Sequence, residues 1–562
     1  MSGTVTIPSG SGASIQLTFG NAQNKSLATS IAAAIAFQND TLIGGTGLFV
    51  QNVTGQGGSG TGAFPVNTGG LTGELIIPVG FTGKVSVTAA DHYSYIIDDS
   101  NGADTIFGFP GASIIAGGGT HTIIDPAAIV LGDTAAGSNN VVTVSGVGDN
   151  VAVGNGHNTI TGADTGSGTI SGGNADNLIL AFGSYVVNSN GSLDTISSGA
   201  HATTVNAAGT NALVFGGSGT LIGHLTGAGT SLVGGSGAGS LTVSGSGNDV
   251  FEESGAMTVL ASGSGDVING AFGSGAFTVT VSGANDTIVS AQNATSVTLT
   301  GAATNALFFG VDSVGPLNIL DQSSTATIVA SGTPVTNITD NGTNELVFGG
   351  AGVLNFIGGA NSATVVGEGA GATSLTAGAG ALVYANAGGS GSVTVVGGSG
   401  GTTLFGIADG SDINFSNSAG AATYVGGAGH ETLNAAGSTT DNLFIGVTDP
   451  TTGVGLLIGG SGNDTLEGAG GATTLTGGAG NNLFLFNKGD IFGAAPQDIV
   501  SDFTASAGNL VLLANYGAGE AAAALAGATT ALGNTTITLS DNTKITFDNT
   551  SIAQLTNHIG SF

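Results

Sequence analysis

The residues best placed to do chemistry lie in one glycine-rich stretch near the C-terminal end of the chain. It reads GGSGNDTLE from Gly459 to Glu467. Its glycines allow a turn that exposes backbone carbonyl oxygens on one side, and Asp464 adds a carboxylate to those oxygens. Ca²⁺ binds about six to eight oxygen ligands of this kind. The stretch therefore predicts a calcium site.

Two further nine-residue segments follow directly. The segment from Gly468 has Thr473 at the position of the aspartate, and the segment from Gly477 has Asn482 there. If two such segments make one turn of a coil, the first and third loops lie on the same side. The predicted ion then lies between those loops, at a site with one carboxylate, while the middle loop stays empty. Its ligands would come from Asp464, Asn482, Gly460, Gly462, Gly478 and Gly480.

The first segment fits the G-G-x-G-x-D-x-U-x pattern of calcium-binding β-rolls at every fixed position, and the two that follow depart from it at the aspartate. On these segments the chain resembles the RTX (haemolysin-type calcium-binding) repeat family over about residues 459–485. Degenerate copies of the same pattern elsewhere in the chain make Asp249, Asp266, Asp286 and Glu431 weaker candidate ligands. The segment DIVSDF from Asp498 resembles the region that follows the repeats in this family. The resemblance implies Ca²⁺ as the bound ion, export by a type I secretion machinery through an uncleaved C-terminal signal, and an extracellular location on bacteria.

Longer repeats in the sequence predict the secondary structure that positions these residues. The phrase TNALVFG begins at Thr210, and close variants begin at Thr304 and Thr343. Looser copies begin at Thr440 and Gly480, and all separations are close to multiples of about 19 residues. A unit of this length suits one coil of two short strands joined by glycine-rich corners. We therefore expect an all-β fold, a parallel β-solenoid or β-roll, with Leu, Val, Ile and Phe inside and Thr and Ser outside.

The two ends of the chain differ from these repeats. Residues 1–110 are expected to form a β-rich N-terminal module that contains one helix at about 24–38, and residues 111–487 the solenoid. Residues 488–562 are expected to form a C-terminal cap that carries the secretion signal. Leu27, Ile31 and Ile35 would share one face of the helix. This face either docks on a neighbouring subunit or covers the first coil of its own chain.

The composition excludes several classes of protein. The 562 residues include 106 Gly, no Cys, 4 Lys+Arg and 35 Asp+Glu, for a net charge of −31. A chain without basic patches is unsuited to binding nucleic acid. The absence of Cys excludes disulfides and cysteine-ligated zinc. No apolar stretch is long enough for a transmembrane helix. Residues 85–487 contain no Lys, so we expect negatively charged solenoid surfaces that repel one another unless divalent cations bridge them.

Three functions remain open at this point. The first is a non-enzymatic extracellular structural protein that is stabilised by calcium and assembles with itself into a surface layer or matrix filament. The second is an adhesin with a solenoid stalk and an N-terminal binding module, for which cell-surface polysaccharide is a candidate partner. The third is an enzyme of the β-helix type that acts on polysaccharide. No close pair of histidines or acid/base pair stands out, which favours the structural function.

Overall fold

A computed structural model describes most of the chain in two compact units, Met1–Val279 and Thr280–Phe562. The residues described are 3–8, 14–19, 22–39, 47–54, 61–100, 102–117, 119–125, 128–131, 139–154, 156–173, 177–310, 315–330, 332, 335–368, 371–388, 391–406, 412–416, 419–427, 429–446, 454–468, 470–489 and 497–562.

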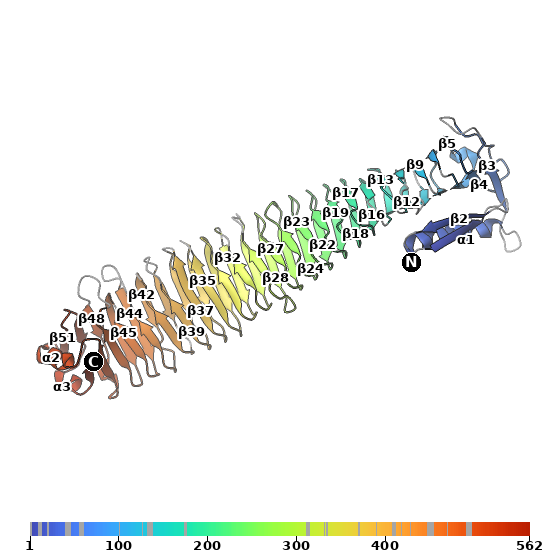
Figure 1. Cartoon of the computed structure of the whole chain (residues 1–562). Helices are drawn as coiled ribbons and strands as arrows, with labels where there is room; N and C mark the ends of the chain where they lie inside the picture. The colour runs from blue at the N-terminus through green and yellow to red at the C-terminus, as the bar shows by residue number, and fades with distance from the viewer. Residues whose placement is uncertain are drawn as a thin grey trace. The chain divides into compact units, whose positions relative to one another are not determined.

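Both units consist of stacked coils, each with one strand in each of two parallel sheets (Figure 1). From β4 to β49, even-numbered strands form one sheet and odd-numbered strands the other, and we name the sheets accordingly. Neighbouring strands in a sheet therefore belong to consecutive coils. Val214 pairs with Leu232, and Leu232 with Val250, so each step across the sheet advances the chain by one coil. The predicted parallel β-solenoid, with a coil length that matches the spacing of the repeat phrase, is confirmed.

The first unit contains the N-terminal elements and the earlier coils. Its even-numbered sheet contains β3 Leu48–Asn52, β4 Thr72–Ile77, β6 Tyr93–Asp98, β8 Ala112–Ala116, β10 Ala128–Leu131, β12 Val147–Ala152, β14 Ser167–Ser171, β16 Ser184–Ser189, β18 Thr203–Ala207, β20 Leu221–Leu225, β22 Gly239–Val243, β24 Met257–Ala261 and β26 Phe277–Val281. Its odd-numbered sheet contains β5 Lys84–Ser86, β7 Ala103–Phe107, β9 Thr120–Asp125, β11 Val141–Val144, β13 Asn158–Gly162, β15 Asn177–Ala181, β17 Thr195–Ser198, β19 Leu213–Phe215, β21 Ser231–Val233, β23 Asp249–Phe251 and β25 Val267–Asn269. The short 3₁₀ helix η1, Ala89–Asp91, precedes β6.

The second unit contains the later coils and the C-terminal elements. Its even-numbered sheet contains β28 Thr295–Leu299, β30 Leu317–Asp321, β32 Val335–Asp340, β34 Val353–Gly358, β36 Thr373–Thr376, β38 Val393–Val396, β40 Ile413–Ser416, β42 His430–Asn434, β44 Val454–Gly460, β46 Ala472–Gly478 and β48 Gln497–Val500. Its odd-numbered sheet contains β27 Thr287–Val289, β29 Leu307–Phe309, β31 Thr327–Val329, β33 Glu345–Phe348, β35 Ala363–Glu368, β37 Leu382–Gly388, β39 Thr402–Phe405, β41 Ala422–Val425, β43 Leu443–Ile445, β45 Thr465–Gly468, β47 Leu483–Asn487 and β49 Leu510–Ala514.

The core of each unit lies between its two sheets. Because successive side chains of a strand point to opposite faces, only alternate residues face the core. In β29, Phe308 is buried, whereas Phe309 is 39% exposed. The same holds in β19, where Val214 is buried and Phe215 is 39% exposed. The expectation that Thr and Ser alone would face outward is therefore wrong for the odd-numbered sheet, because three consecutive apolar residues cannot all point inward.

The N-terminal helix covers its own chain. The strands β1 Gly3–Pro8 and β2 Ser14–Phe19 form an antiparallel hairpin, and α1 spans Ala22–Asn39. Ile31 and Ile35 pack in one cluster with Ile97 and Ile115, which lie at the ends of β6 and β8. Leu27 packs against this cluster. The helix face is therefore covered within the chain, which answers the question that the sequence left open and leaves that face no docking role.

The boundaries of the solenoid also differ from those expected. Parallel pairing already begins between β3 and β4, where Leu48 pairs with Thr72, so the stacked coils start before residue 110. At the C-terminal end, an antiparallel meander adds to the last even-numbered strands. It comprises β50 Thr529–Ala531, β51 Asn534–Thr538 and β52 Lys544–Phe547. The same region contains the short helices η2 Phe503–Ala505, α2 Glu520–Ala526 and α3 Ile552–Leu555, and the strand β53 Ile559–Ser561, which pairs parallel with β49.

The C-terminal elements close the end of the core. Phe503 lies with its ring centroid 6.1 Å from that of Phe484 in the last coils, and 5.6 Å from that of Phe547 in β52. This packing has the form of the cap that the sequence predicted for this region. Among the helices that the structure describes, none combines the length and apolar character needed to cross a membrane.

Candidate functional site

Asp464 and Asn482, the main calcium candidates, lie at one repeated corner of the coils. A buried residue near the start of each odd-numbered strand stacks on its counterparts in the coils before and after it, and we name this column the corner ladder. In the first unit its members are Asp104, His121, Asn140, Asn158, Asn177, Asp194, Ala212, Thr230, Asn248 and Asp266. In the second unit they are Asp286, Ala306, Ala326, Glu345, Ala363, Leu382, Thr402, Ala422, Asn442, Asp464, Asn482 and Asn509.

Polar members of the ladder bond to the backbone of the preceding coil. The Asn442 N–H donates to Asp464 Oδ1 at 2.8 Å, and the Asp464 N–H donates to Asn482 Oδ1 at 2.9 Å. The Asn482 N–H in turn donates to Asn509 Oδ1 at 2.8 Å. Asp464 and Asn482 therefore lie next to each other, as the sequence predicted for the first and third segments, and each ties its coil to the one before.

The Asp464 carboxylate has N–H donors on both oxygens. Oδ1 also accepts a hydrogen bond from Asn442 Nδ2 at 2.7 Å, and Oδ2 accepts one from the Gly460 N–H at 2.7 Å. The side chain is buried. Because buried polar groups need partners, these bonds alone account for an aspartate at this corner. In this arrangement the oxygens face N–H donors, and calcium binding by Asp464 and Asn482 stays a prediction.

The glycines of the predicted site have a structural reason of their own. Gly478 and Gly480 have φ angles of +83° and +87°, in the left-handed region that favours glycine. A Cβ atom on Gly478 would lie 2.2 Å from the carbonyl oxygen of Gly460, and one on Gly480 would lie 2.1 Å from that of Gly462. The four glycines therefore allow consecutive coils to approach closely, whether or not an ion is bound.

The weaker candidates occupy three different positions. Asp266 and Asp286 are buried members of the corner ladder, and Asp266 Oδ1 accepts the N–H of Asn248 at 2.8 Å. Asp249 lies one residue after the ladder and is partly exposed. Glu431 lies in the even-numbered sheet, where its Oε1 accepts the Gly427 N–H at 2.7 Å, and burial raises its pKa to about 7. Neither Asp249 nor Glu431 is therefore equivalent to Asp464.

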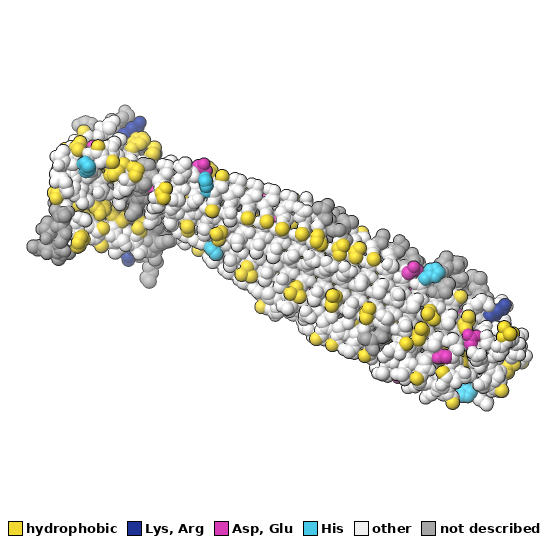
Figure 2. Space-filling view, turned by 180° about the vertical axis from the view of Figure 1, so that it is seen from behind, with side chains coloured by type: hydrophobic (Ala, Val, Ile, Leu, Met, Phe, Trp, Pro, Cys, Tyr) yellow, Lys and Arg dark blue, Asp and Glu magenta, His cyan; other side chains and the backbone are white. Residues whose placement is uncertain are grey.

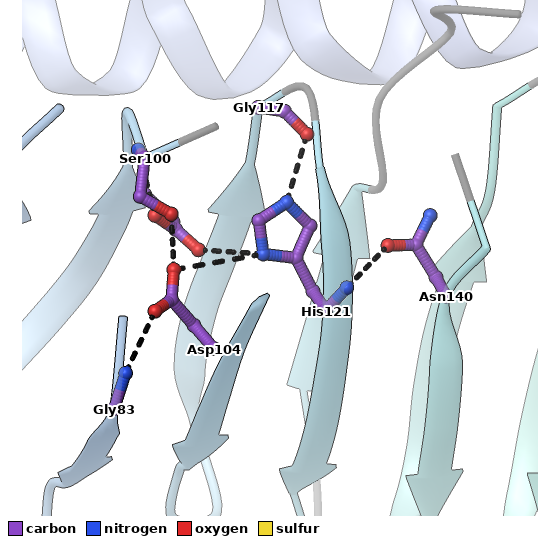
Figure 3. Close-up of polar contacts among 7 residues, drawn as sticks. Gly83, Ser100, Asp104, Gly117, His121 and Asn140 are labelled. Atoms are coloured by element: carbon purple, nitrogen blue, oxygen red, sulfur yellow. Dashed lines mark hydrogen bonds and ion pairs between the residues drawn. The ribbon is translucent and has the colours of Figure 1, made fainter. Parts of the chain in front are cut away.

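A cluster that the sequence analysis missed lies in the first coils. His121 Nδ1 is 3.0 Å from Asp98 Oδ2 and 3.9 Å from Asp104 Oδ2, and the side chains are buried (Figure 3). His121 Nε2 lies 3.1 Å from the Gly117 carbonyl oxygen. Ser100 donates its hydroxyl to Asp104 and its N–H to Asp98. An imidazolium would lie at ion-pair distance from both carboxylates and within hydrogen-bond distance of the Gly117 carbonyl oxygen, so the three side chains form a buried ion triad.

The charges of the triad determine its protonation. Burial alone would lower the pKa of His121, but the hydrogen bond and charge of Asp98, with smaller contributions from Gly117 and Asp104, raise it above its usual value. Burial raises the pKa of Asp104, which the Ser100 hydroxyl opposes. The residues are 6 and 17 positions apart in the sequence and match no ligand motif, so only the folded coils bring them together.

Many acidic side chains of the coils are inside the protein rather than on its surface. At least fourteen of the 35 acids are buried: Glu74, Asp98, Asp104, Asp149, Asp194, Glu252, Asp266, Asp286, Asp321, Asp340, Glu345, Glu431, Asp464 and Asp498. On the face seen in Figure 2, acidic side chains are sparse and hydrophobic ones form rows. The expected uniform repulsion between solenoid surfaces is therefore weaker than the net charge of −31 suggests.

The outer face of the odd-numbered sheet carries a continuous apolar column in the second unit. In register, it consists of Val289, Phe309, Val329, Phe348, Val366, Ala385, Phe405, Val425 and Ile445. These side chains are exposed or partly exposed. At about 4.8 Å between strands, the column is about 40 Å long. We name it the outer apolar column.

The outer face of the even-numbered sheet is more polar. There, Asn337 Nδ2 donates to Asn318 Oδ1 at 2.9 Å, and Asn355 Nδ2 donates to Asn337 Oδ1 at 2.9 Å, in an outward-facing asparagine ladder. Apolar residues such as Leu320 and Ile357 alternate with Thr339 along the adjacent column. The two outer faces therefore differ in character, and the odd-numbered one is the better surface for association.

No family model, curated protein or solved structure matches this chain.

Proposed function

We propose that the protein is a non-enzymatic extracellular structural protein whose copies associate side by side through the outer apolar column. The observation that carries this proposal is the column itself, which presents nine stacked apolar side chains without one charged residue. Contiguous exposed apolar surface of this kind is typical of interaction sites. Its position on a rigid parallel sheet, rather than on loops, suits a repeated assembly contact.

A second copy of the chain is the occupant that the column fits best. The side chains recur at the spacing of the strands, so a second column has the same period and can interdigitate with the first over its whole length. A partner surface without stacked strands would match only part of it. An uncharged column on a chain of net charge −31 also favours a partner surface that is itself uncharged.

Burial of carboxylates supports the same proposal. Lateral association of an acidic protein is opposed by surface charge, and the side chains of many acids here are turned toward the core instead. Divalent cations would make a second contribution to lateral association, because they can bridge the acidic side chains that remain exposed on neighbouring copies. The surface-layer or matrix-filament form, the bacterial cell surface as location and type I export are parts of this proposal that depend on the resemblance to the RTX family.

Charge substitutions on the column test the proposal. Phe309 and Phe405 are 39% and 41% exposed, so their replacement by glutamate leaves the core unchanged. We expect the variant Phe309→Glu/Phe405→Glu to stay monomeric under conditions in which the unmodified protein forms large assemblies, because it places charges on both copies of the contact. The molar mass, measured by light scattering in millimolar Ca²⁺, gives the result.

The matched control lies on the other sheet. Leu320 and Val396 are 36% and 40% exposed on the outer face of the even-numbered sheet. The variant Leu320→Glu/Val396→Glu adds the same charge at a similar exposure and should assemble like the unmodified protein. Equal assembly of all three proteins, or loss of assembly in the control alone, would contradict association through the outer apolar column.

A further inference from the structure

Three buried carboxylates converge at one corner of the second unit. Asp321 and Asp340 end β30 and β32 and are paired neighbours in the even-numbered sheet. Glu345 begins β33 in the odd-numbered sheet, shortly after Asp340 in the chain. One oxygen from each of the three side chains lies within 4.8 Å of the other two. All three side chains are at most 2% exposed.

Several oxygens at this corner lack hydrogen-bond partners among the residues that the structure describes. There, no donor meets either carboxylate oxygen of Glu345, or Asp321 Oδ2, in full hydrogen-bond geometry. Backbone N–H groups of Ala326 and Thr343 near Glu345 lower its pKa, but burial and the two aspartates raise it by more. Asp321 Oδ1 accepts the N–H and hydroxyl of Ser323, and Asp340 Oδ1 accepts the Gly342 N–H at 2.8 Å. These bonds hold the two aspartates in place, and one oxygen of each of the three acids lies within 4.8 Å of the others. Such an arrangement is unfavourable unless something positive lies between them.

No basic side chain is available to compensate these acids. Between His224 and His430 the sequence contains no Lys, Arg or His. In a solenoid each coil contacts mainly its neighbours, so groups so distant in sequence do not reach this corner. The neutralising group must therefore come from outside the chain, as protons or as a metal cation.

The neighbouring residues make room for Glu345. Its column neighbours in the corner ladder are Ala326 and Ala363, and the equivalent residue in the two closest copies of the repeat phrase is Ala212 or Ala306. A Cβ atom on Gly342 would lie 2.2 Å from Glu345 Oε1. A glutamate thus replaces the alanine of the repeat at a corner where two aspartates lie close to it.

We propose that Asp321, Asp340 and Glu345 bind one Ca²⁺ ion between two consecutive coils. The available donors are all oxygens, which hard cations prefer, and neither nitrogen nor sulfur is present to favour zinc. Two oxygens that bind the same Ca²⁺ at about 2.3–2.6 Å can be at most about 5 Å apart. The separations at this corner meet that limit before any movement of side chains.

Protons compete with the ion at this corner. Burial, with the charges of Asp321 and Asp340, raises the pKa of Glu345 to about 8, and burial raises the pKa of Asp340 to about 6. Without a cation the corner therefore retains protons near neutral pH. A bound Ca²⁺ displaces them and links β30, β32 and β33, so the ion stabilises the folded coils by mass action. The site does not depend on the lateral association proposed above.

Hydrogen exchange of the full chain tests this proposal. The exchange of backbone amides in residues 317–348 is measured by mass spectrometry in chelator, in Ca²⁺ and in Mg²⁺. We expect Ca²⁺ to slow exchange there by about tenfold or more, because opening these coils releases the ion. The variant Glu345→Ala restores the alanine of the other repeats, so it should fold and lose this calcium-dependent slowing.

Two controls make the result specific. Glu252→Ala removes another buried glutamate that lies outside the cluster and should leave the effect of Ca²⁺ on residues 317–348 unchanged. The same measurement on Phe309→Glu/Phe405→Glu separates ion binding from assembly. Exchange that is unaffected by Ca²⁺ in the unmodified protein, or a full calcium effect in Glu345→Ala, would overturn the proposal. Slowing by Mg²⁺ alone would overturn the choice of calcium.

Discussion

Replacing Asp464 with alanine is expected to destabilise the C-terminal coils by about 2–6 kcal/mol, because buried N–H donors lose their acceptor at about 1–3 kcal/mol each. The backbone N–H groups of Asn442 and Gly460 both donate to this carboxylate. Asp464→Asn retains an oxygen for Asn442 and should cost less. Hydrogen exchange of residues 443–487 and the thermal midpoint measure both variants.

The same variants distinguish two roles of Asp464, as an acceptor of hydrogen bonds in the corner ladder or as a calcium ligand. If Asp464 acts mainly through its N–H bonds, the loss in Asp464→Ala is the same in chelator as in Ca²⁺. If it acts mainly as a calcium ligand, the loss disappears in chelator, and Asp464→Asn is nearly as damaging as Asp464→Ala in Ca²⁺. Ser461→Ala, in the same turn but exposed, is the control: it removes one hydroxyl hydrogen bond to the Ser438 carbonyl oxygen and should cost at most about 0.5–1.5 kcal/mol, in chelator and in Ca²⁺ alike.

Replacing His121 with asparagine should cost about 3–5 kcal/mol near pH 6, because it leaves two buried carboxylates without their cation. The raised pKa of His121 fixes the pH dependence. Its stabilising contribution is complete below the pKa of about 6.5 that histidine has in the unfolded chain, and it is lost as pH rises through the higher pKa of the folded protein. The difference between variant and unmodified protein should therefore shrink at alkaline pH.

Local hydrogen exchange of β6 to β9 across this pH range gives the measurement. His224→Asn is the control, because His224 is exposed on the outer face of the even-numbered sheet. The control should show no pH-dependent loss in β6 to β9. A difference between His121→Asn and the unmodified protein that stays constant with pH would contradict an imidazolium in the triad.

The repeat phrase was sufficient to predict the architecture. Regularly spaced copies of TNALVFG require a coil with two short strands, and the strands β19, β29 and β33 occupy the three copies. The helix at 24–38 was predicted close to the bounds of α1, because its apolar residues recur with helical spacing. Both the coil architecture and the helix were predicted from the regular spacing of residues along the sequence.

The roles of the acidic residues at the corners of the coils were harder to predict from the sequence. The motif around Asp464 identified a corner of the coil correctly, but motif spacing alone does not distinguish a cation ligand from an acceptor of N–H bonds. Asp321, Asp340 and Glu345 match no motif, because they meet only when consecutive coils stack. The one available signal was Glu345 itself, which replaces the alanine found at positions 212 and 306.

The outer apolar column was also missed, although its residues are part of the repeat phrase. Leu, Val and Phe in sequence were all interpreted as core residues. A strand alternates its faces, so burial of Val347 requires Leu346 and Phe348 to point outward. The apolar residues of the phrase therefore indicate two apolar surfaces, one inside the coil and one outside it.

Cross-linking through single cysteines tests the central claim most directly. The chain has no native cysteine, so Val366→Cys places one thiol on the outer apolar column and Leu320→Cys places one on the opposite sheet. Val366 is the central residue of the column, so it meets its own equivalent whether the two columns run parallel or antiparallel. Each protein is assembled under reducing conditions and then oxidised. We expect disulfide-linked dimers in high yield from Val366→Cys and few from Leu320→Cys. Dimers from Leu320→Cys alone, or equal low yields from both in fully assembled protein, would contradict association through the outer apolar column.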